Sequence, residues 1–139
     1  MPGGTAQAQV GHRDHPDWAG PGSVREFQPD QDSPRDARRF VAGQLGPLAG
    51  HAVAADAVIV IAELAANALK HARSPFTVAV SHLPGALRIS VRDAVPLADG
   101  ERLRTLPGHG LDLVAKVSTR WAVEPLPDGK VIWAELPTA

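Results

Sequence analysis

Residues 63–72, with the sequence ELAANALKHA, group polar side chains at helical spacing near the middle of the chain. At about 100° per residue, Glu63, Asn67 and Lys70 fall on one stripe of a helix, and Asp56 lies on the same side further upstream. A carboxylate, an amide oxygen and an ammonium group in this arrangement suit a hydrated magnesium ion and phosphate oxygens. The apolar residues of the opposite side are Val58, Ile61, Ala65, Ala68 and Leu69. An amphipathic surface helix with a solvated polar face has the same pattern, so both interpretations stay open here.

Asp93 is a second candidate, because it stands where an apolar residue is expected. Leu87, Ile89 and Val91 alternate with polar residues, as in a half-buried strand, and Asp93 continues their phase. A carboxylate on an apolar face costs free energy unless a donor reaches it. Asp93 therefore either caps the turn that follows the strand or meets a ligand's donor in a mostly apolar pocket. The exocyclic amino group of a purine would be such a donor.

Two glycines, Gly108 and Gly110, flank His109 just before an apolar helical pattern that begins at Leu111. Free backbone amides at a helix N-terminus are a natural phosphate site, and glycine lets phosphate oxygens approach the main chain closely. The alternative without a ligand is an ordinary loop that ends in a helix cap. The glycines close a long irregular stretch, residues 94–107, and loops of that length are often lids or binding loops.

Composition bounds the class of protein. The 139 residues fit one domain, and a net charge of -1 shows no basic excess of the kind that nucleic-acid binders carry. With no cysteine, neither a disulfide framework nor a thiolate metal site is expected. The sequence shows no signal peptide and no long uncharged apolar run, which predicts a cytoplasmic protein without a membrane span. Residues 1–22 are predicted to be a flexible tail and residues 23–139 a single domain.

The helices and strands that must position these residues are predicted from the spacing of apolar residues and from glycine and proline, which end such segments. Ser33 is expected to cap a helix that has Pro34 in its first turn and ends at Gly46. A second helix is expected from residue 52 or 54 to residue 72, and a third after the glycines. Strands are expected at residues 23–28, 76–81, 86–93, 120–126 and 130–136. This order predicts an α+β fold with helices on one face of a mixed, mostly antiparallel sheet.

Taken together, these segments resemble the ATP-binding fold shared by DNA gyrase and histidine kinases, the Bergerat or GHKL fold. Residues 63–72 resemble its N box, residues 91–96 the box that carries the adenine-binding aspartate, and residues 108–111 its glycine box. The sequences RWAVEP at 120–125 and WAEL at 133–136 resemble the small bacterial anti-sigma-factor serine kinases. The resemblance covers about residues 23–137, with two departures: residues 94–96, which follow Asp93, read AVP without the glycine usual in sensor kinases, and His109 stands where relatives often have arginine.

The resemblance implies a role for each candidate residue. Asn67 would coordinate the magnesium ion that bridges the phosphates of ATP, and Asp93 would accept a hydrogen bond from the adenine amino group. Glu63 would act as the general base that polarises an attacking hydroxyl. The remaining implied phosphate contacts come from the amides around Gly108, His109, Gly110 and Leu111, and from the positive charge of Lys70 or His71.

The leading hypothesis for the function is an ATP-dependent regulatory serine/threonine kinase. By the resemblance, it would phosphorylate a serine of an anti-sigma antagonist and bind a sigma factor. The alternative is a non-catalytic module that binds ATP or a protein partner, because fold does not fix function. A generic ATP hydrolase is a third hypothesis. The resemblance also allows a homodimer, whereas direct contacts with nucleic acid or membrane are not expected.

Overall fold

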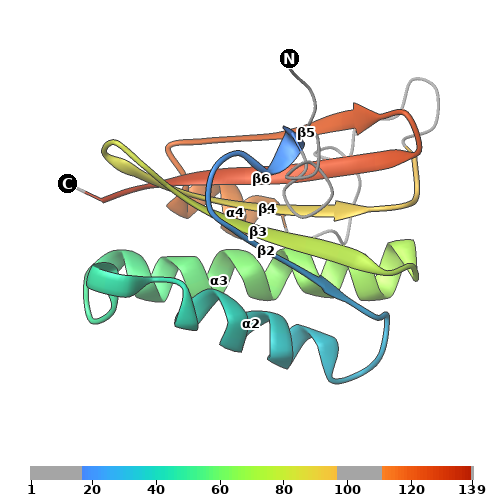
Figure 1. The fold of residues 1–139 in the computed structure, drawn as a ribbon, viewed down its shortest axis with the longest axis horizontal. Coiled ribbons are helices and arrows are strands. Elements are labelled where there is room, and N and C mark those ends of the chain that lie inside the picture. The colour runs from blue at the N-terminus through green and yellow to red at the C-terminus, as the bar shows by residue number, and fades with distance from the viewer. Residues whose placement is uncertain (1–16, 97–110, 139) are drawn as a thin grey trace, which may run out of the picture.

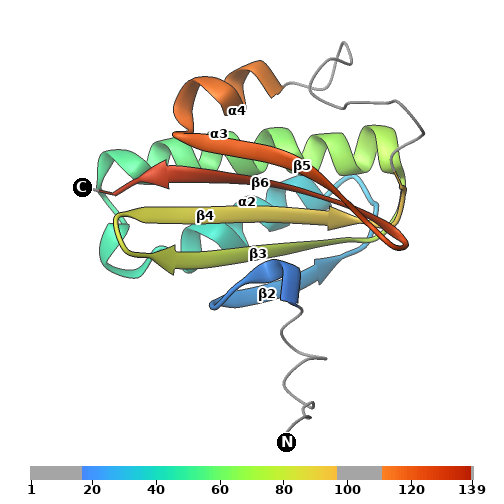
Figure 2. The same cartoon turned by 90° about the horizontal axis from the view of Figure 1, so that it is seen from above.

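The computed structural model describes residues 17–96 and 111–138. These residues form a helical layer packed on one face of a five-stranded sheet (Figures 1 and 2). The strands are β2 (Ser23–Phe27), β3 (Phe76–Leu83), β4 (Ala86–Asp93), β5 (Arg120–Leu126) and β6 (Gly129–Pro137). The helices are α2 (Ser33–Gly43), α3 (Ala52–Asn67) and α4 (Leu111–Val117), with the 3-10 turns η1 (Asp17–Ala19) and η2 (Gly46–Leu48) and the π-helical turn η3 (Ala68–Ala72).

The sheet has the strand order β2-β3-β4-β6-β5, and each neighbouring pair is antiparallel. Two tight hairpins, β3–β4 and β5–β6, are joined by the β4–β6 ladder in the middle of the sheet. The α+β class and the helices on one sheet face, both predicted from the sequence, are confirmed. The central strand β4 ends at Asp93, which is paired with Phe76 on one side and Lys130 on the other.

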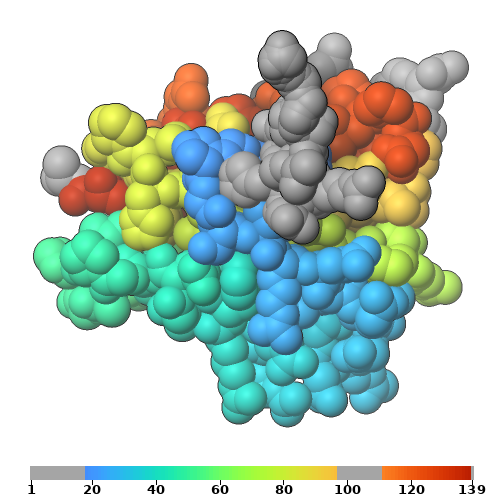
Figure 3. Space-filling view, in the orientation of Figure 1, coloured from blue at the N-terminus to red at the C-terminus, as the bar shows by residue number. Residues whose placement is uncertain are grey.

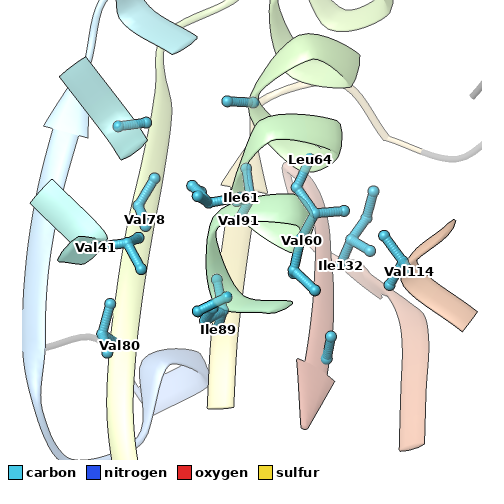
Figure 4. Close-up of a cluster of buried hydrophobic side chains, with 14 of the residues drawn as sticks. Val41, Val60, Ile61, Leu64, Val78, Val80, Ile89, Val91, Val114 and Ile132 are labelled. Atoms are coloured by element: carbon cyan, nitrogen blue, oxygen red, sulfur yellow. The ribbon is translucent and has the colours of Figure 1, made fainter. Parts of the chain in front are cut away.

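The core lies between α3 and the sheet (Figure 4). Val60, Ile61 and Leu64 of α3 are fully buried, and they face the buried side chains of Ile89 in β4 and Ile132 in β6. Fully burying one such side chain stabilises the fold by about 1.5–3 kcal/mol, so this face of α3 fixes the helix on the sheet. The alternating phase predicted for β4 is therefore the core-facing phase, and Asp93 belongs to it.

Two local predictions were wrong. Ser33 does not cap α2: it is the first residue of the helix, and Asp32 occupies the cap position without a side-chain cap bond. The Ser33 hydroxyl instead donates toward the carbonyl oxygens of Gln28 and Asp30, at 2.6 Å from each, and so ties the helix to the end of β2. Val58, expected on the apolar flank of α3, is 37% exposed, because the buried stripe of that helix runs through positions 53, 57, 60, 61 and 64 instead.

By length and apolar composition alone, the helix formed by residues 52–72 could cross a membrane. The same test is passed by the core helices of soluble proteins, and 44% of the tested window is buried inside the structure. The apolar composition of this helix is accounted for by its contacts with the sheet on one side and α2 on the other. It is therefore weak evidence for a membrane span.

Residues 17–22, which the sequence analysis places in the tail, contact the sheet face opposite to α3. Ala19 of η1 is fully buried, and its carbonyl oxygen accepts a hydrogen bond of 2.9 Å from the Ser81 hydroxyl of β3. Figure 3 looks onto the β2 edge of the sheet and shows the η1–β2 segment in blue near the middle of the view. The first sixteen residues lie outside the described part of the chain.

Candidate functional site

Asp93 lies at the last position of β4 with its side chain on the core-facing side, and its side chain is only 6% exposed. Its Oδ1 atom accepts a hydrogen bond of 2.9 Å from the backbone N–H of Val95, two residues later. Part of the turn-capping role considered for Asp93 is therefore present. This bond alone does not compensate for burying a full negative charge, since one amide carries no net charge.

Lys130 supplies the missing charge. It is the second residue of β6 and lies directly opposite Asp93 in the β4–β6 register. Its Nζ atom is 3.0 Å from Asp93 Oδ1 and donates a second hydrogen bond, of 2.9 Å, to the carbonyl oxygen of Val95. The ammonium group thus joins the end of β4, the first residues after it and the beginning of β6.

Lys130 is a residue that the sequence analysis missed, although a signal for it exists. Ile132, Ala134 and Leu136 face the core at every second position of β6, and Lys130 continues that phase toward the N-terminus of the strand. Two charges of opposite sign, each in phase with an apolar strand face, indicate a buried pair once the strands are taken to be neighbours. The strand order could not be read from either segment alone.

Asn67 is the last residue of α3 and is buried, with 8% exposure. Its side-chain nitrogen Nδ2 finds no hydrogen-bond partner in the described part of the chain. A buried N–H donor without a partner costs free energy, which makes this position a point where an acceptor atom of a ligand would complete the structure. The chain leaves the α-helical geometry directly after Asn67, in the π-helical turn η3, and such turns often occur at functional sites.

The remaining polar residues of this helix are more accessible. Glu63, four residues before Asn67 on the same helix face, is partly buried, and no hydrogen bond or ion pair involves its carboxylate among the described residues. Lys70 and His71 lie in η3 and are exposed. Both follow the change from α to π geometry, so their directions differ from those that a continuous α-helix would give.

The glycine segment lies mostly outside the described residues, since Gly108, His109 and Gly110 belong to the 97–110 gap. Leu111, the first residue of α4, is buried and belongs to the core cluster. The predicted helix after the glycines is therefore present, while the phosphate-binding role of the segment stays a prediction.

The described candidate residues come from one end of the fold. The end of β4, the beginning of β6 and the end of α3 with η3 lie together in Figures 1 and 2. Contacts between η3 and β4 agree with this placement. The antiparallel ladder and the packing of α3 thus bring Asp93, Lys130 and Asn67 to the same end, although each pair of them is 26 or more positions apart in sequence.

A magnesium-bound adenine nucleotide requires oxygen ligands for the metal and an acceptor for the amino group of the ring. No group of three or more acidic, histidine or cysteine side chains that could hold a metal gathers within residues 17–96 and 111–138. Mg²⁺ in nucleotide sites usually keeps several waters and takes only one or two protein ligands besides the phosphates. The side-chain oxygen of Asn67 would be one such ligand, whereas its unpartnered Nδ2 is a donor and would pair with a phosphate or water oxygen. The buried carboxylate of Asp93 fits the ring amino group, so the described residues are compatible with the nucleotide.

A second polar cluster lies on the opposite face of the sheet. Glu135 of β6 accepts hydrogen bonds from Arg88 and Arg120, each at 3.0 Å, and the guanidinium of Arg88 lies 4.0 Å from the ring centroid of Trp133. The hydrogen bond from Arg120 lowers the pKa of Glu135, burial opposes this, and the charges of both arginines add to the lowering. The same contact raises the pKa of Arg120. This cluster shares no residue with the Asp93 site.

The fold resembles that of a known structure. A crystal structure of the RsbU and RsbW domains of Rv1364c from Mycobacterium tuberculosis matches with a TM-score of 0.59 and 18% sequence identity. The match covers 84% of this chain and 33% of that chain, so this chain spans about a third of the length of the chain it matches. No known protein family matches the chain, and no curated protein matches it either. The likeness confirms the fold implied by the sequence resemblance and leaves the function to be argued from the site.

Proposed function

We propose that this chain binds ATP with Mg²⁺ at the end of the sheet marked by Asp93, and acts as a regulatory serine/threonine kinase of the anti-sigma-factor type. The observation that carries the proposal is the buried, core-facing carboxylate of Asp93 at the end of β4. An ionised group in that place requires polar partners, and its Oδ2 atom is the acceptor that a ligand's amino group needs. The unpartnered Nδ2 donor of Asn67 at the same end of the fold supports a second contact, to a phosphate oxygen.

The proposed roles of the chain's own residues follow from their positions. Asn67 would hold the metal, whose charge would neutralise the phosphates when the nucleotide is bound. Glu63 lies one helical turn before Asn67 and is partly exposed, so its carboxylate is open to a hydroxyl that approaches from solvent. Such a carboxylate would orient the hydroxyl and accept its proton. Lys70, exposed in η3, would add positive charge near the phosphates.

Nucleotide binding is tested by thermal unfolding with and without Mg-ATP. A ligand that binds only the folded state raises the melting temperature, and at about a hundred times its Kd it adds about 2.7 kcal/mol of stability. We expect this rise in the wild type and its loss in Asp93→Asn and Asn67→Ala. A matched control is Asp128→Asn, an exposed carboxylate at the β5–β6 turn, which should keep the rise. Equal rises in all four proteins would refute the proposed site.

Phosphoryl transfer needs its own experiment. Labelled ATP is incubated with the protein and with candidate antagonist proteins of sigma-factor regulation, and transfer to a serine is measured. We expect transfer with the wild type and a loss of at least tenfold with Glu63→Ala, a modest figure for a general base. The control Glu26→Ala removes an exposed carboxylate on β2 and should leave transfer unchanged. Transfer that is equal in wild type and Glu63→Ala would rule out Glu63 as the base.

A non-catalytic regulatory module is the second candidate, and one observation favours it. Asp93 already accepts hydrogen bonds from Lys130 and from Val95, so its carboxylate is partly satisfied without any ligand. A domain that has kept the fold but lost turnover would tolerate such internal satisfaction. Tight nucleotide binding without transfer to any partner protein would favour this candidate over the kinase.

A further inference from the structure

Lys130 is a buried lysine at the end of the sheet where the nucleotide is proposed to bind. It is 8% exposed, and lysine side chains are almost never buried to that extent unless they are paired. The residue before it, Gly129, allows β6 to begin against the end of β4, because a Cβ there would lie 2.0 Å from the carbonyl oxygen of Asp93. The backbone is thus arranged so that the Lys130 side chain is held beside Asp93.

The hydrogen bonds of this pair can be counted. An ammonium group has three donors, and Lys130 uses two of them, toward Asp93 Oδ1 at 3.0 Å and the carbonyl oxygen of Val95 at 2.9 Å. The Asp93 carboxylate receives both of its described hydrogen bonds, from Lys130 and from the Val95 N–H, on the same oxygen, Oδ1. One N–H of Lys130 and the Oδ2 oxygen of Asp93 therefore remain next to each other for a further partner.

Stability alone is a weak explanation for this pair. The free-energy cost of desolvating two buried charges is similar in size to their attraction. Replacing such a pair with apolar residues is therefore often neutral or stabilising for the fold. The neighbours in the same layer are apolar: Phe76 is paired with Asp93 across β3–β4, and Val91 and Ile132 form the next inward pair of the β4–β6 ladder. An apolar pair would extend this layer, whereas an adjacent donor and acceptor can recognise the polar edge of a ligand.

We infer that Lys130 is a specificity-determining residue that reads the base of a bound adenine nucleotide together with Asp93. The inference rests on the proposed nucleotide binding. The edge of adenine carries an amino donor beside the ring nitrogen N1, which is an acceptor. Asp93 Oδ2 would accept from the amino group, and the third N–H of Lys130 would donate to N1. Guanine presents a carbonyl oxygen and a ring N–H in these places, so donor and acceptor are reversed and the buried pair would be left unmatched.

The test compares the affinity of the wild-type protein for ATP with its affinity for 1-deaza-ATP, in which N1 is replaced by a C–H group. Titration calorimetry in the presence of Mg²⁺ measures both. Because a hydrogen bond to a charged group is among the stronger ones, we expect 1-deaza-ATP to bind about tenfold more weakly. Lys130→Met should bind the two nucleotides equally. Lys116→Met removes an exposed lysine of α4 and should keep the tenfold difference.

The outcomes separate this inference from the proposed function. Equal affinities of the wild type for ATP and 1-deaza-ATP would overturn the role of Lys130 while nucleotide binding itself stands. A tenfold difference that persists in Lys130→Met would overturn it as well. If the wild type does not bind ATP at millimolar concentration, the proposed function fails, and the inference fails with it. The wild-type comparison does not depend on whether Lys130→Met folds.

Discussion

Glu135 of β6 lies directly opposite Arg88 of β4 in the sheet register, and its Oε2 atom accepts a hydrogen bond of 3.0 Å from Arg88 Nε. Its other oxygen accepts a hydrogen bond of 3.0 Å from Arg120 of β5. One carboxylate thus connects three adjacent strands, on the face of the sheet away from the helices. The guanidinium groups of both arginines also lie over the Trp133 ring, at 4.0 and 5.5 Å from its centroid.

The first prediction concerns the pH dependence of stability. The pKa of Glu135 is lowered in the folded state, chiefly by the hydrogen bond from Arg120. Its stabilising contribution is therefore present above the unfolded-state pKa and is lost as pH falls through the lower, folded-state pKa. We expect Glu135→Gln to be less stable than the wild type at pH 7, with the difference shrinking below about pH 4. Urea unfolding at several pH values measures this, with Glu26→Gln, an exposed carboxylate on β2, as the control.

The second prediction concerns the packing of α3 on the sheet. Leu64 is fully buried in the core cluster, so Leu64→Ala should lower the free energy of unfolding by about 2–5 kcal/mol through lost burial and the cavity left behind. Ile59→Ala is the matched control, because Ile59 lies on the same helix and is 36% exposed. Chemical denaturation of both variants gives the comparison. Similar losses in the two would contradict the placement of the buried face of α3.

The third prediction concerns the close approach of the N-terminal segment to β3. Gly22 has a φ of +141°, and a Cβ at this position would lie 2.0 Å from the carbonyl oxygen of Val80. The unusual φ and the clash with a backbone carbonyl cannot be relieved by moving a side chain. Gly22→Ala should therefore cost about 1–3 kcal/mol of stability. A Cβ at Gly43, the last residue of α2, meets nothing within 4 Å. Gly43→Ala should therefore be neutral or slightly stabilising, and a loss as large as that of Gly22→Ala would be unexpected.

The sequence alone predicts most of the fold because its periodic signals are local. Alternation at every second position in β3 and β4, and the turn at Pro84 and Gly85, predict the hairpin that the structure contains. Asp93 could be singled out as a site residue for the same reason, since its phase within β4 is a local property. The partner of Asp93 could not, because Lys130 becomes its neighbour only through the β4–β6 pairing.

Some local features could not be predicted, because a residue has more than one possible hydrogen-bond partner or packing direction. Ser33 has the side chain of a helix cap, yet its hydroxyl reaches the carbonyl oxygens of Gln28 and Asp30, and Asp32 takes the cap position. The change from α to π geometry after Asn67 has no marker in the apolar pattern, so the directions of Lys70 and His71 could not be predicted. The buried stripe of α3 is set by contacts with both α2 and the sheet, which places Val58 outside it.

The last prediction contrasts two residues of the candidate site in the absence of any nucleotide. The Nδ2 atom of Asn67 has no partner in the described part of the chain, and a buried polar group without a hydrogen bond costs about 1–3 kcal/mol. Asn67→Leu removes that cost and introduces a better helix former, so its melting temperature should equal or exceed that of the wild type. Asp93→Leu should instead lose about 3–5 kcal/mol, because it leaves the ammonium of Lys130 buried without its counter-ion. Calorimetric unfolding of both variants without nucleotide tests the contrast. Residues that serve ligand binding often lower the stability of the free protein. A clear destabilisation by Asn67→Leu would therefore argue against a ligand-binding role for this amide.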